Sequence, residues 1–236
     1  MKTIGLIGGM SWASTVEYYR ILNQAVNQRL GGLHSAKILL YSVDFAEIEL
    51  TMREDRWADA ARMLVEAARR LEAGGAELIV LCTNTLHKVA GEIERSTRLS
   101  FIHITDACGA AILARKLKKI GLLGTRFTME QDFLSARLKS GFGLEVIIPE
   151  AADREEAHRI IFEELVLGKI EPRSEQKYLE IIKGLVARGA EGIILGCTEI
   201  GLLVKQADVA VPVFDTTVIH AQAAVEMALA GEKVGV

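Results

Sequence analysis

Two short stretches of this sequence recur in similar form, and they decide the fold. Residues 2–8 read KTIGLIG, and residues 118–124 read KKIGLLG, about 116 positions later. Residues 76–81 read AELIVL, and residues 190–195 read AEGIIL, about 114 positions later. One such match could arise by chance between two buried strands. Two matches in the same order and at nearly the same offset favour a duplication, so we expect two similar halves of roughly 100–120 residues, a normal domain size.

Short apolar runs alternate with longer helical patterns, which predicts an α/β fold. Continuous apolar character within the runs is typical of parallel strands covered on both faces. The expected strands are residues 2–7, 37–43, 77–81, 101–104, 119–123, 144–148, 192–195 and 211–214. We expect two pseudo-symmetric, duplicated domains, each with a parallel sheet: residues 1–107 plus roughly 212–236, and residues 108–211.

Local signals predict where several helices begin and end. The residues from Ser14 to Glu17 and from Thr128 to Gln131 have the form of a capping box at a helix start. Gly74-Gly75 and Gly189 follow long helical stretches, where a residue with positive φ is expected at the helix end.

Composition excludes several classes of protein. The 236 residues include 28 Lys and Arg against 31 Asp and Glu, a net charge of 28 − 31 = −3, with no basic block of the kind that binds nucleic acid. No apolar run approaches the roughly 18 residues that span a bilayer, and the first strand begins at once, without a signal-peptide pattern. Three cysteines form no secreted disulfide framework. We expect a cytoplasmic globular protein with reduced thiols, which binds neither nucleic acid nor a membrane.

The duplication also makes a statement about chemistry. It places Thr83 opposite Cys197, directly beyond the end of a buried strand, where open α/β sheets build their sites. If the halves face each other across a cleft, these two residues approach one substrate from opposite sides, which suits a reaction with two proton-transfer groups. Cys82 lies one residue earlier, so it should point the other way and pack in the core, and Cys108 should pack within a small-residue helix.

Two other features have more than one interpretation. The turn in residues 5–11, GLIGGMS, is neither G-x-G-x-x-G nor a P-loop, so either Ser11 and the backbone N–H groups hold a small anion, or glycine and Ser11 only form a turn and a cap. The five histidines have no metal-site spacing, so no metal is expected. His87 and His220 lie near strand-to-helix turns, where they either line a cleft, cap a helix or belong to the core.

Five motifs in order along the chain resemble those of the aspartate/glutamate racemase family, whose members work without pyridoxal phosphate. They are GLIGGMSW (5–12), TNTLH (83–87), GLLGT (121–125), GCTE (196–199) and FDTTVIH (214–220). The GCTE form resembles the aspartate racemase branch, since glutamate racemases usually carry His after the Thr. The resemblance implies two pseudo-symmetric domains with the amino-acid substrate in the cleft between them, no cofactor, and a homodimer.

The family mechanism uses two opposed cysteines, one removing the α-proton while the other reprotonates the opposite face. Most relatives read Cys-Asn-Thr where this chain reads Thr83-Asn84-Thr85, so the pair here is Thr83 and Cys197. Family precedent implies that Cys197 serves the L-face and Thr83 the D-face. A hydroxyl is a much weaker acid than a thiol, which puts symmetric racemisation in doubt. The expected substrate-binding residues are Met10, Ser11, Asn84, Thr85, Thr125 and Thr198.

The substrate is less well defined by the sequence than the reaction. Acidic specificity needs a cation or donor set for the distal carboxylate. Relatives place an arginine after the second strand, but residues 44–49 read DFAEIE here, and Met52 and Arg53 are the nearest candidates. The alternatives to an aspartate or glutamate racemase are a broad-specificity amino-acid racemase, a superfamily enzyme acting on another carbon acid, and a non-catalytic amino-acid binding protein. A thiol redox protein would need facing cysteines, which the packing of Cys82 argues against.

Overall fold

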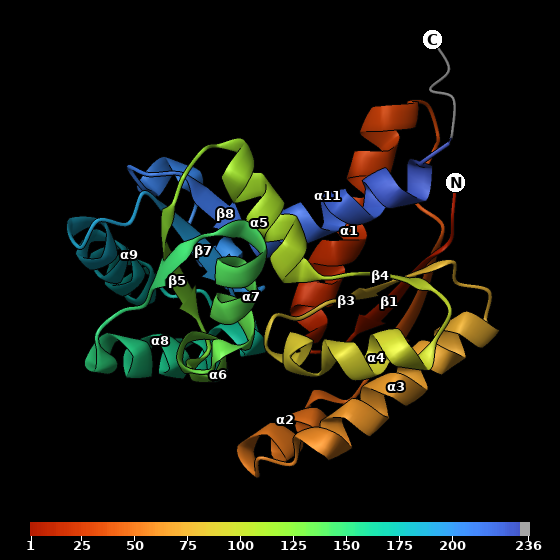
Figure 1. The fold of residues 1–236 in the computed structure, drawn as a ribbon, viewed down its shortest axis with the longest axis horizontal. Helices are drawn as coiled ribbons and strands as arrows, with labels where there is room; N and C mark the ends of the chain where they lie inside the picture. Colours follow the sequence, from red (N-terminus) through yellow and green to blue (C-terminus); the bar gives the residue numbers. More distant parts are fainter. Residues whose placement is uncertain (232–236) are drawn as a thin grey trace. The chain divides into compact units, whose positions relative to one another are not determined.

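The chain divides into two compact units, each with its own sheet. A computed structural model describes residues 1–231; the last part of the expected first domain, residues 232–236, lies outside the described residues. The first unit comprises residues 1–103 with the C-terminal segment from His220, and the second comprises residues 104–219. Figure 1 shows both units along the course of the chain.

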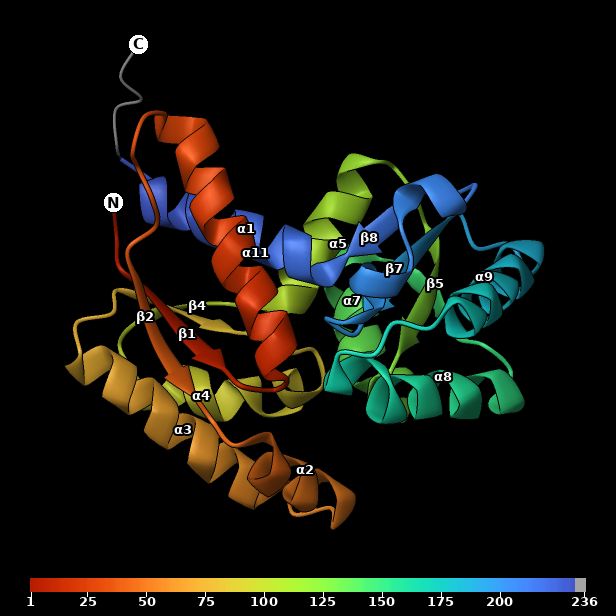
Figure 2. The same ribbon diagram turned by 180° about the vertical axis from the view of Figure 1, so that it is seen from behind.

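The first unit is a four-stranded parallel sheet in the order β2-β1-β3-β4. Its strands are β1 (Ile4–Gly8), β2 (Ile38–Ser42), β3 (Leu78–Leu81) and β4 (Ser100–Ile102). On one face lie α1 (Trp12–Leu30) and the part of α11 (Thr216–Leu229) that belongs to this unit, and on the other α3 (Trp57–Ala73) and α4 (Ala90–Ser96) (Figure 2). Two short helices complete the unit, α2 (Phe45–Arg53) and the 3-10 helix η1 (Thr85–Val89).

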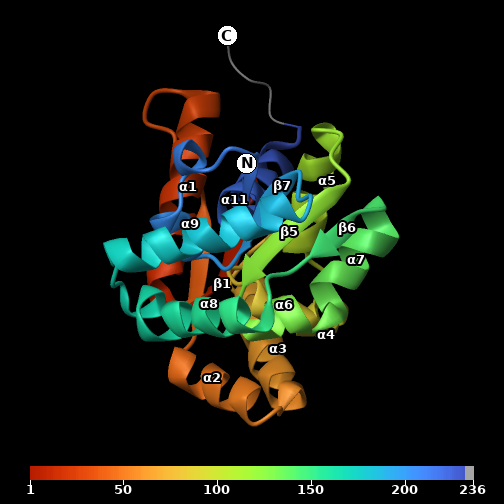
Figure 3. The same ribbon diagram turned by 90° about the vertical axis from the view of Figure 1, so that its left-hand side faces the viewer.

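The second unit repeats this architecture, with strand order β6-β5-β7-β8 and all strands parallel. Its strands are β5 (Lys119–Gly124), β6 (Glu145–Ile147), β7 (Gly192–Gly196) and β8 (Val213–Asp215). The helices α5 (Ile104–Ala114) and α7 (Asp132–Phe142) pack together, and α8 (Ala151–Glu163) and α9 (Pro172–Ala187) pack against β5 (Figure 3). Short helices are α6 (Arg126–Glu130), α10 (Ile200–Leu203), η2 (Leu165–Leu167) and η3 (Gln206–Asp208). The predicted α/β class with duplicated parallel sheets is confirmed.

The strand register agrees with the alignment of the two repeats. In the first sheet Ile7 pairs with Leu81, and in the second Leu123 pairs with Leu195. Counting forward from these pairs, Thr83 and Cys197 occupy equivalent positions, two residues beyond the paired leucines. Cys82 is fully buried in the apolar core of its unit and Cys108 is buried in the core of the other, as predicted.

The two expected capping boxes are wrong in position. Ser11 caps α1 and Thr125 caps α6, and their hydroxyls accept hydrogen bonds from the backbone N–H groups of Ser14 and Thr128. The reason is that a helix cap needs an extended backbone, which Ser11 and Thr125 have because they follow the strand-to-helix turn. Ser14 and Thr128 therefore lie inside the first turn.

The helix ends agree with the sequence. Gly75 has φ 93° after α3, and Gly189 has φ 92° after α9. Both take the conformation that a non-glycine residue rarely adopts. Within residues 1–231, none of the helices has the length and apolar character needed to cross a membrane.

Candidate active site

Each sheet has a topological switch point, where successive connections lead to opposite sides of one strand. The connection from β1 leads outward to β2, whereas β3 and β4 lie on the other side of β1. The second sheet does the same around β5 and β7. In open parallel sheets, ligands bind beyond the carboxyl ends of the strands at this point. We therefore expect site residues in the turns after β1 and β3 of the first sheet, and in the turns after β5 and β7 of the second.

The turn after β1 is tightly constrained. Gly9 has φ 95°, and a Cβ there would lie 2.3 Å from the carbonyl oxygen of Val43. The Gly9 N–H donates to the Thr15 hydroxyl at 2.8 Å, and the carbonyl oxygen of Ser11 accepts from the same hydroxyl. Met10 and Ser11 are both buried. These contacts assign turn and capping roles to Gly9 and Ser11, and anion binding at this turn stays a prediction.

The turn after β3 carries Thr83, and backbone hydrogen bonds hold it on both sides. The N–H of Cys82 continues the sheet by donating to the carbonyl of Ile7 at 2.9 Å. The N–H of Thr83 donates to the carbonyl of Leu81 at 2.8 Å. The carbonyl of Thr83 lies 2.7 Å from Nδ1 of His87. Thr83 and the following Asn84 and Thr85 are buried, so this turn is an ordered part of the unit.

Behind this turn lies a cluster of buried rings from distant parts of the sequence. The ring centroid of His87 is 4.6 Å from that of His103 and 5.7 Å from that of His220. His220 bonds to the carbonyl of Ile102 through Nε2 and to the Tyr18 hydroxyl through Nδ1, both at 2.8 Å. Burial lowers the pKa of His220 to about 4, so the ring is neutral near pH 7. A carbonyl only accepts, so Nε2 carries the proton and Nδ1 accepts from Tyr18. His87 and His220 thus belong to the core.

The second unit carries Cys197 at the end of β7. Its thiol donates to Oε2 of Glu199 at 3.0 Å, and the Thr198 hydroxyl donates to the same oxygen at 2.7 Å. Cys197 is 8 % exposed and Glu199 is 2 % exposed. Sequence reasoning did not assign a role to Glu199, although the GCTE motif contains it at the position where glutamate racemases usually carry His.

The surroundings of the Cys197 thiol have opposite effects on its pKa. Burial, followed by the charge and the hydrogen bond of Glu199, raises the pKa of Cys197 well above its usual value. Backbone hydrogen bonds from Glu199 and Ile200 act the other way and lower that pKa. Cys197 in this state is a protonated thiol whose proton is held by a carboxylate.

Thr125 stands at the end of β5, next to the Cys197 turn, because β5 pairs with β7. Its hydroxyl oxygen lies 3.1 Å from that of Thr128 and accepts from the N–H of Thr128 at 3.2 Å.

The motif at residues 214–220 has a structural role at its start. The carboxylate of Asp215 accepts from the N–H groups of Thr217 and Val218 at the beginning of α11, and burial raises its pKa.

The predicted site residues fall into two sets. In the first unit, the turns with Met10 and Ser11 and with Thr83 to Thr85 follow neighbouring strands. In the second unit, Thr125 and Thr198 likewise follow neighbouring strands, together with Cys197. Thr83 and Cys197 belong to different units, so their approach to one substrate stays a prediction.

The two candidates for the distal carboxylate differ from each other. Met52 is buried within α2. The Arg53 side chain is 67 % exposed and pairs with Glu49 at 3.9 Å. Arg53 is therefore not held as a buried cation in this structure.

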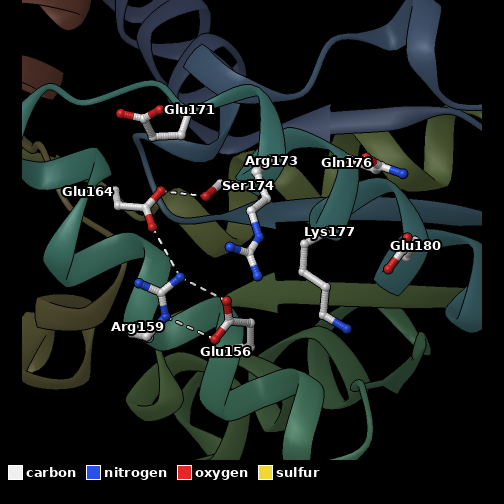
Figure 4. Close-up of a pocket in the computed structure, with 9 residues that line it drawn as sticks. All are labelled: Glu156, Arg159, Glu164, Glu171, Arg173, Ser174, Gln176, Lys177 and Glu180. Carbon is white, nitrogen blue, oxygen red and sulfur yellow. Dashed lines mark hydrogen bonds and ion pairs between the residues drawn. The ribbon is translucent and has the colours of Figure 1, made fainter.

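A separate hollow of about 860 Å³ lies on the surface beside α8 and α9 (Figure 4). Two of its basic side chains are held in ion pairs, since Arg159 pairs with Glu156 and Glu164, and Lys177 pairs with Asp153. It shares no residue with the turns described above. Within residues 1–231, no group of three or more His, Cys, Asp or Glu side chains is placed to hold a metal ion.

The chain is similar in sequence and in structure to known racemases. The profile of Asp/Glu/hydantoin racemases matches residues 7–224. The chain belongs to the Asp/Glu/hydantoin racemase family. A crystal structure of a candidate Asp/Glu racemase from Yersinia pestis is 56 % identical with a TM-score of 0.90, over 97 % of this chain and 100 % of that one. An aspartate racemase homologue from Pyrococcus horikoshii OT3 is 38 % identical with a TM-score of 0.83, over 97 % and 99 %.

A broad-specificity amino-acid racemase of Bacillus subtilis is 24 % identical over 244 residues, which is 96 % of this chain and 98 % of that protein. The racemase family expected from the five motifs is therefore confirmed, and with it the enzyme class of amino-acid racemases. Within the racemase family, the substrate and the two-base mechanism of this chain are matters for proposal.

Proposed function

We propose that this protein racemises an acidic amino acid, aspartate or glutamate, without a cofactor, by transferring the α-proton between Cys197 and Thr83. The observation that carries the proposal is the equivalence of these two residues, each two positions beyond a paired leucine at the switch point of its own sheet. Membership in the Asp/Glu/hydantoin racemase family and the aspartate racemase homologue support the substrate class.

The difficulty of the reaction is the weak acidity of the α-proton. A free thiol has a pKa near 8.5, and burial raises that of Cys197 further, so the thiolate is scarce before substrate binds. We propose that Glu199, which already accepts the thiol hydrogen bond, takes this proton. The thiolate then removes the α-proton of the L-substrate. Hydrogen bonds from neighbouring hydroxyls, including that of Thr125, stabilise the carboxylate charge that develops in the planar intermediate.

On the opposite face, the Thr83 hydroxyl donates its proton to the α-carbon and must then regain one. This step is demanding because a hydroxyl is a far weaker acid than a thiol. The two enantiomers have equal free energy, so the ratio of kcat/KM in the two directions equals one. The asymmetry appears instead in kcat, in KM and in the exchange of the α-proton without inversion.

The experiment that tests the function is proton NMR of L-amino acids with the protein in deuterated buffer, without cofactor. We expect L-aspartate or L-glutamate to lose the α-proton signal faster than the D-enantiomer accumulates. Equal rates of α-proton exchange and of inversion would contradict the expectation that Thr83 is the less effective proton donor. The absence of exchange with every amino acid, in a folded protein, would favour a non-catalytic amino-acid binding protein.

One observation favours a wider substrate range as the second candidate. Arg53 is exposed and pairs with Glu49, while Met52 and Met10 are buried apolar side chains. The broad-specificity racemase of Bacillus subtilis supports the same alternative. The NMR experiment with a mixture of L-amino acids separates the two candidate functions. Exchange limited to aspartate and glutamate supports acidic specificity, whereas exchange with apolar amino acids supports a broad-specificity racemase. Other carbon acids of the superfamily are tested in the same buffer.

The assembly and location of the protein are also proposals. The exposed side chains of Trp12, Val16 and Tyr19 recur on one face of α1, which supports burial of this face in a homodimer. A monomer in analytical ultracentrifugation at micromolar concentration would contradict it. The three cysteines are free thiols, which supports a cytoplasmic location.

A further inference from the structure

We propose that His87 is a positioning residue that sets the direction of the Thr83 hydroxyl through its hydrogen bond to the Thr83 carbonyl. The inference rests on the proposed function, because it assigns the D-face of the reaction to Thr83. It concerns a residue that touches the backbone of Thr83 and does not itself exchange a proton with the substrate.

The backbone of Thr83 has two anchors, and they differ in kind. Its N–H donates to the carbonyl of Leu81, which belongs to β3 and so moves with the sheet. Its carbonyl is bonded by the His87 ring at 2.7 Å. The first bond holds the peptide plane before the Thr83 Cα, and the second holds the plane after it and so fixes the torsion ψ. Together the two bonds set the direction of the Cα–Cβ bond. Loss of the second anchor leaves this torsion free to change while the strand keeps its register.

The imidazole is suited to hold one orientation. Because a carbonyl oxygen only accepts, Nδ1 of His87 carries a proton and donates it. The backbone N–H of His87 also donates to the carbonyl of Asn84 at 3.0 Å, which closes the turn from inside. Thr83 and His87 are four residues apart, so the bond belongs to the turn itself.

Rings from other elements prevent the imidazole from rotating away. The ring of His103 lies edge-on at 4.6 Å between centroids, and Phe101 and His220 lie at 5.7 Å. His220 is itself held by the Tyr18 hydroxyl and the carbonyl of Ile102. The support for the Thr83 turn therefore extends from α1, β4 and α11, three elements that are far apart in the sequence.

The consequence is specific to one face of the substrate. Cys197 lies in the other unit and has its own hydrogen bonds, none of which involves His87. Removing the His87 donor should therefore slow the step that needs Thr83 and leave the removal of the L-substrate α-proton by Cys197 unchanged. A residue that only stabilised the fold would slow both steps together.

The test compares His87→Asn with His87→Leu, two side chains of nearly equal shape. The amide nitrogen of Asn takes the place of Nδ1 and can donate, whereas Leu cannot. Each variant is measured in deuterated buffer for exchange of the L-substrate α-proton and for formation of the D-enantiomer. We expect His87→Leu to lower the rate of inversion about 10- to 100-fold, as expected for a misplaced catalytic group, with exchange within about twofold of wild type. His87→Asn should restore most of the inversion rate.

Equal loss of exchange and inversion in His87→Leu, or failure of His87→Asn to restore inversion, would overturn the positioning role. A second measurement does not depend on activity. Nitrogen NMR of the histidine-labelled wild type should show the Nδ1–H tautomer for the ring that disappears in His87→Leu. If the wild type proves inactive but shows this tautomer, the proposed function is wrong while the hydrogen bond stands. If it is active and shows the Nε2–H tautomer, the inference is wrong.

Discussion

The thiol of Cys197 lies 3.0 Å from a carboxylate oxygen of Glu199 and donates a hydrogen bond to it. Both side chains are buried, so the pair meets little competition from water. The carboxylate has two opposite effects on the thiol. Its charge raises the pKa of Cys197, and its lone pair is the nearest place for the thiol proton to go.

Replacement of Glu199 by Gln should separate these two effects. Without the negative charge, the pKa of Cys197 falls, so the pH dependence of α-proton exchange should move to lower pH. Without a proton acceptor, the maximal rate should fall about 100-fold, a typical contribution of a general base. The measurement is the exchange rate of L-aspartate between pH 5 and 10. The control is Glu191→Gln, an exposed carboxylate of the same unit, which should leave the profile unchanged.

Cys197→Ser should abolish exchange of the L-substrate α-proton, because a serine hydroxyl is a far weaker acid than the thiol and would not give up its proton to Glu199. The substitution changes one atom, so the stability should change little. Exchange rates by NMR and thermal unfolding of both proteins provide the check. Exchange at the wild-type rate in a folded Cys197→Ser protein is incompatible with the proposed mechanism.

Thr83→Cys should raise turnover of the D-substrate, because it supplies a thiol at the position equivalent to Cys197. Cys82→Ala is the matched control. Cys82 is buried in the core, and burial raises its pKa far above the usual value, so its loss should leave activity unchanged and lower stability by about 1 kcal/mol. Loss of activity in a well-folded Cys82→Ala protein would mean that the register is shifted by one residue.

Gly9→Ala should destabilise the first unit by about 3 kcal/mol. The added Cβ would lie 2.3 Å from the carbonyl oxygen of Val43, and the backbone has φ 95°. Gly184→Ala, in the last turn of α9, is the control, since a Cβ there meets nothing within 4 Å, and it should stabilise the protein by about 0.5–1 kcal/mol. Urea unfolding curves measure both, and equal midpoints for the two variants would contradict the prediction.

The neutral, buried His220 should make stability depend on pH. Its pKa is about 4 in the folded protein and about 6.5 when unfolded, so below pH 6.5 the unfolded chain binds a proton that the folded one does not. The stabilisation is complete above pH 6.5 and is lost as the pH falls towards 4, an effect of about 3 kcal/mol. Unfolding free energies at pH 7 and pH 4.5 measure it.

His220→Gln should flatten this slope, because Gln does not titrate. His158 also has a lowered pKa, through burial, and contributes in the same direction, so His158→Gln is needed as a parallel control. A slope that His220→Gln leaves unchanged would assign the pH dependence to other groups.

Much of the fold followed from the sequence because buried parallel strands leave a strong local pattern. The eight strands in the described residues lie within two residues of the predicted limits at their starts and ends, and runs such as Leu78–Leu81 are buried throughout. The helix caps were displaced by three residues, because the sequence shows which residues can cap but not where the turn ends. The short helix α2 was not predicted, since residues 44–49 read as a mixed acidic and apolar connection.

The site was only partly predictable, for a different reason. The repeat gave the equivalence of Thr83 and Cys197, which depends on strand register alone. The bond between Cys197 and Glu199 depends on how the chain bends after β7, and the contact between Tyr18 and His220 joins residues 202 positions apart. No local pattern encodes such a contact.

The course of the chain has a consequence for how the protein is made. The core of the first unit includes Ala221, Ala224, Val225 and Ala228 of α11, close to the end of the sequence. On the ribosome, all of residues 104–219 emerge before these core residues of α11 do. The second unit can therefore fold during synthesis, whereas this apolar face of the first sheet stays uncovered until residues 221–228 have been synthesised. His220, which supports the Thr83 turn, belongs to the same segment, so the ring cluster behind that turn can be completed only after the whole second unit has been synthesised.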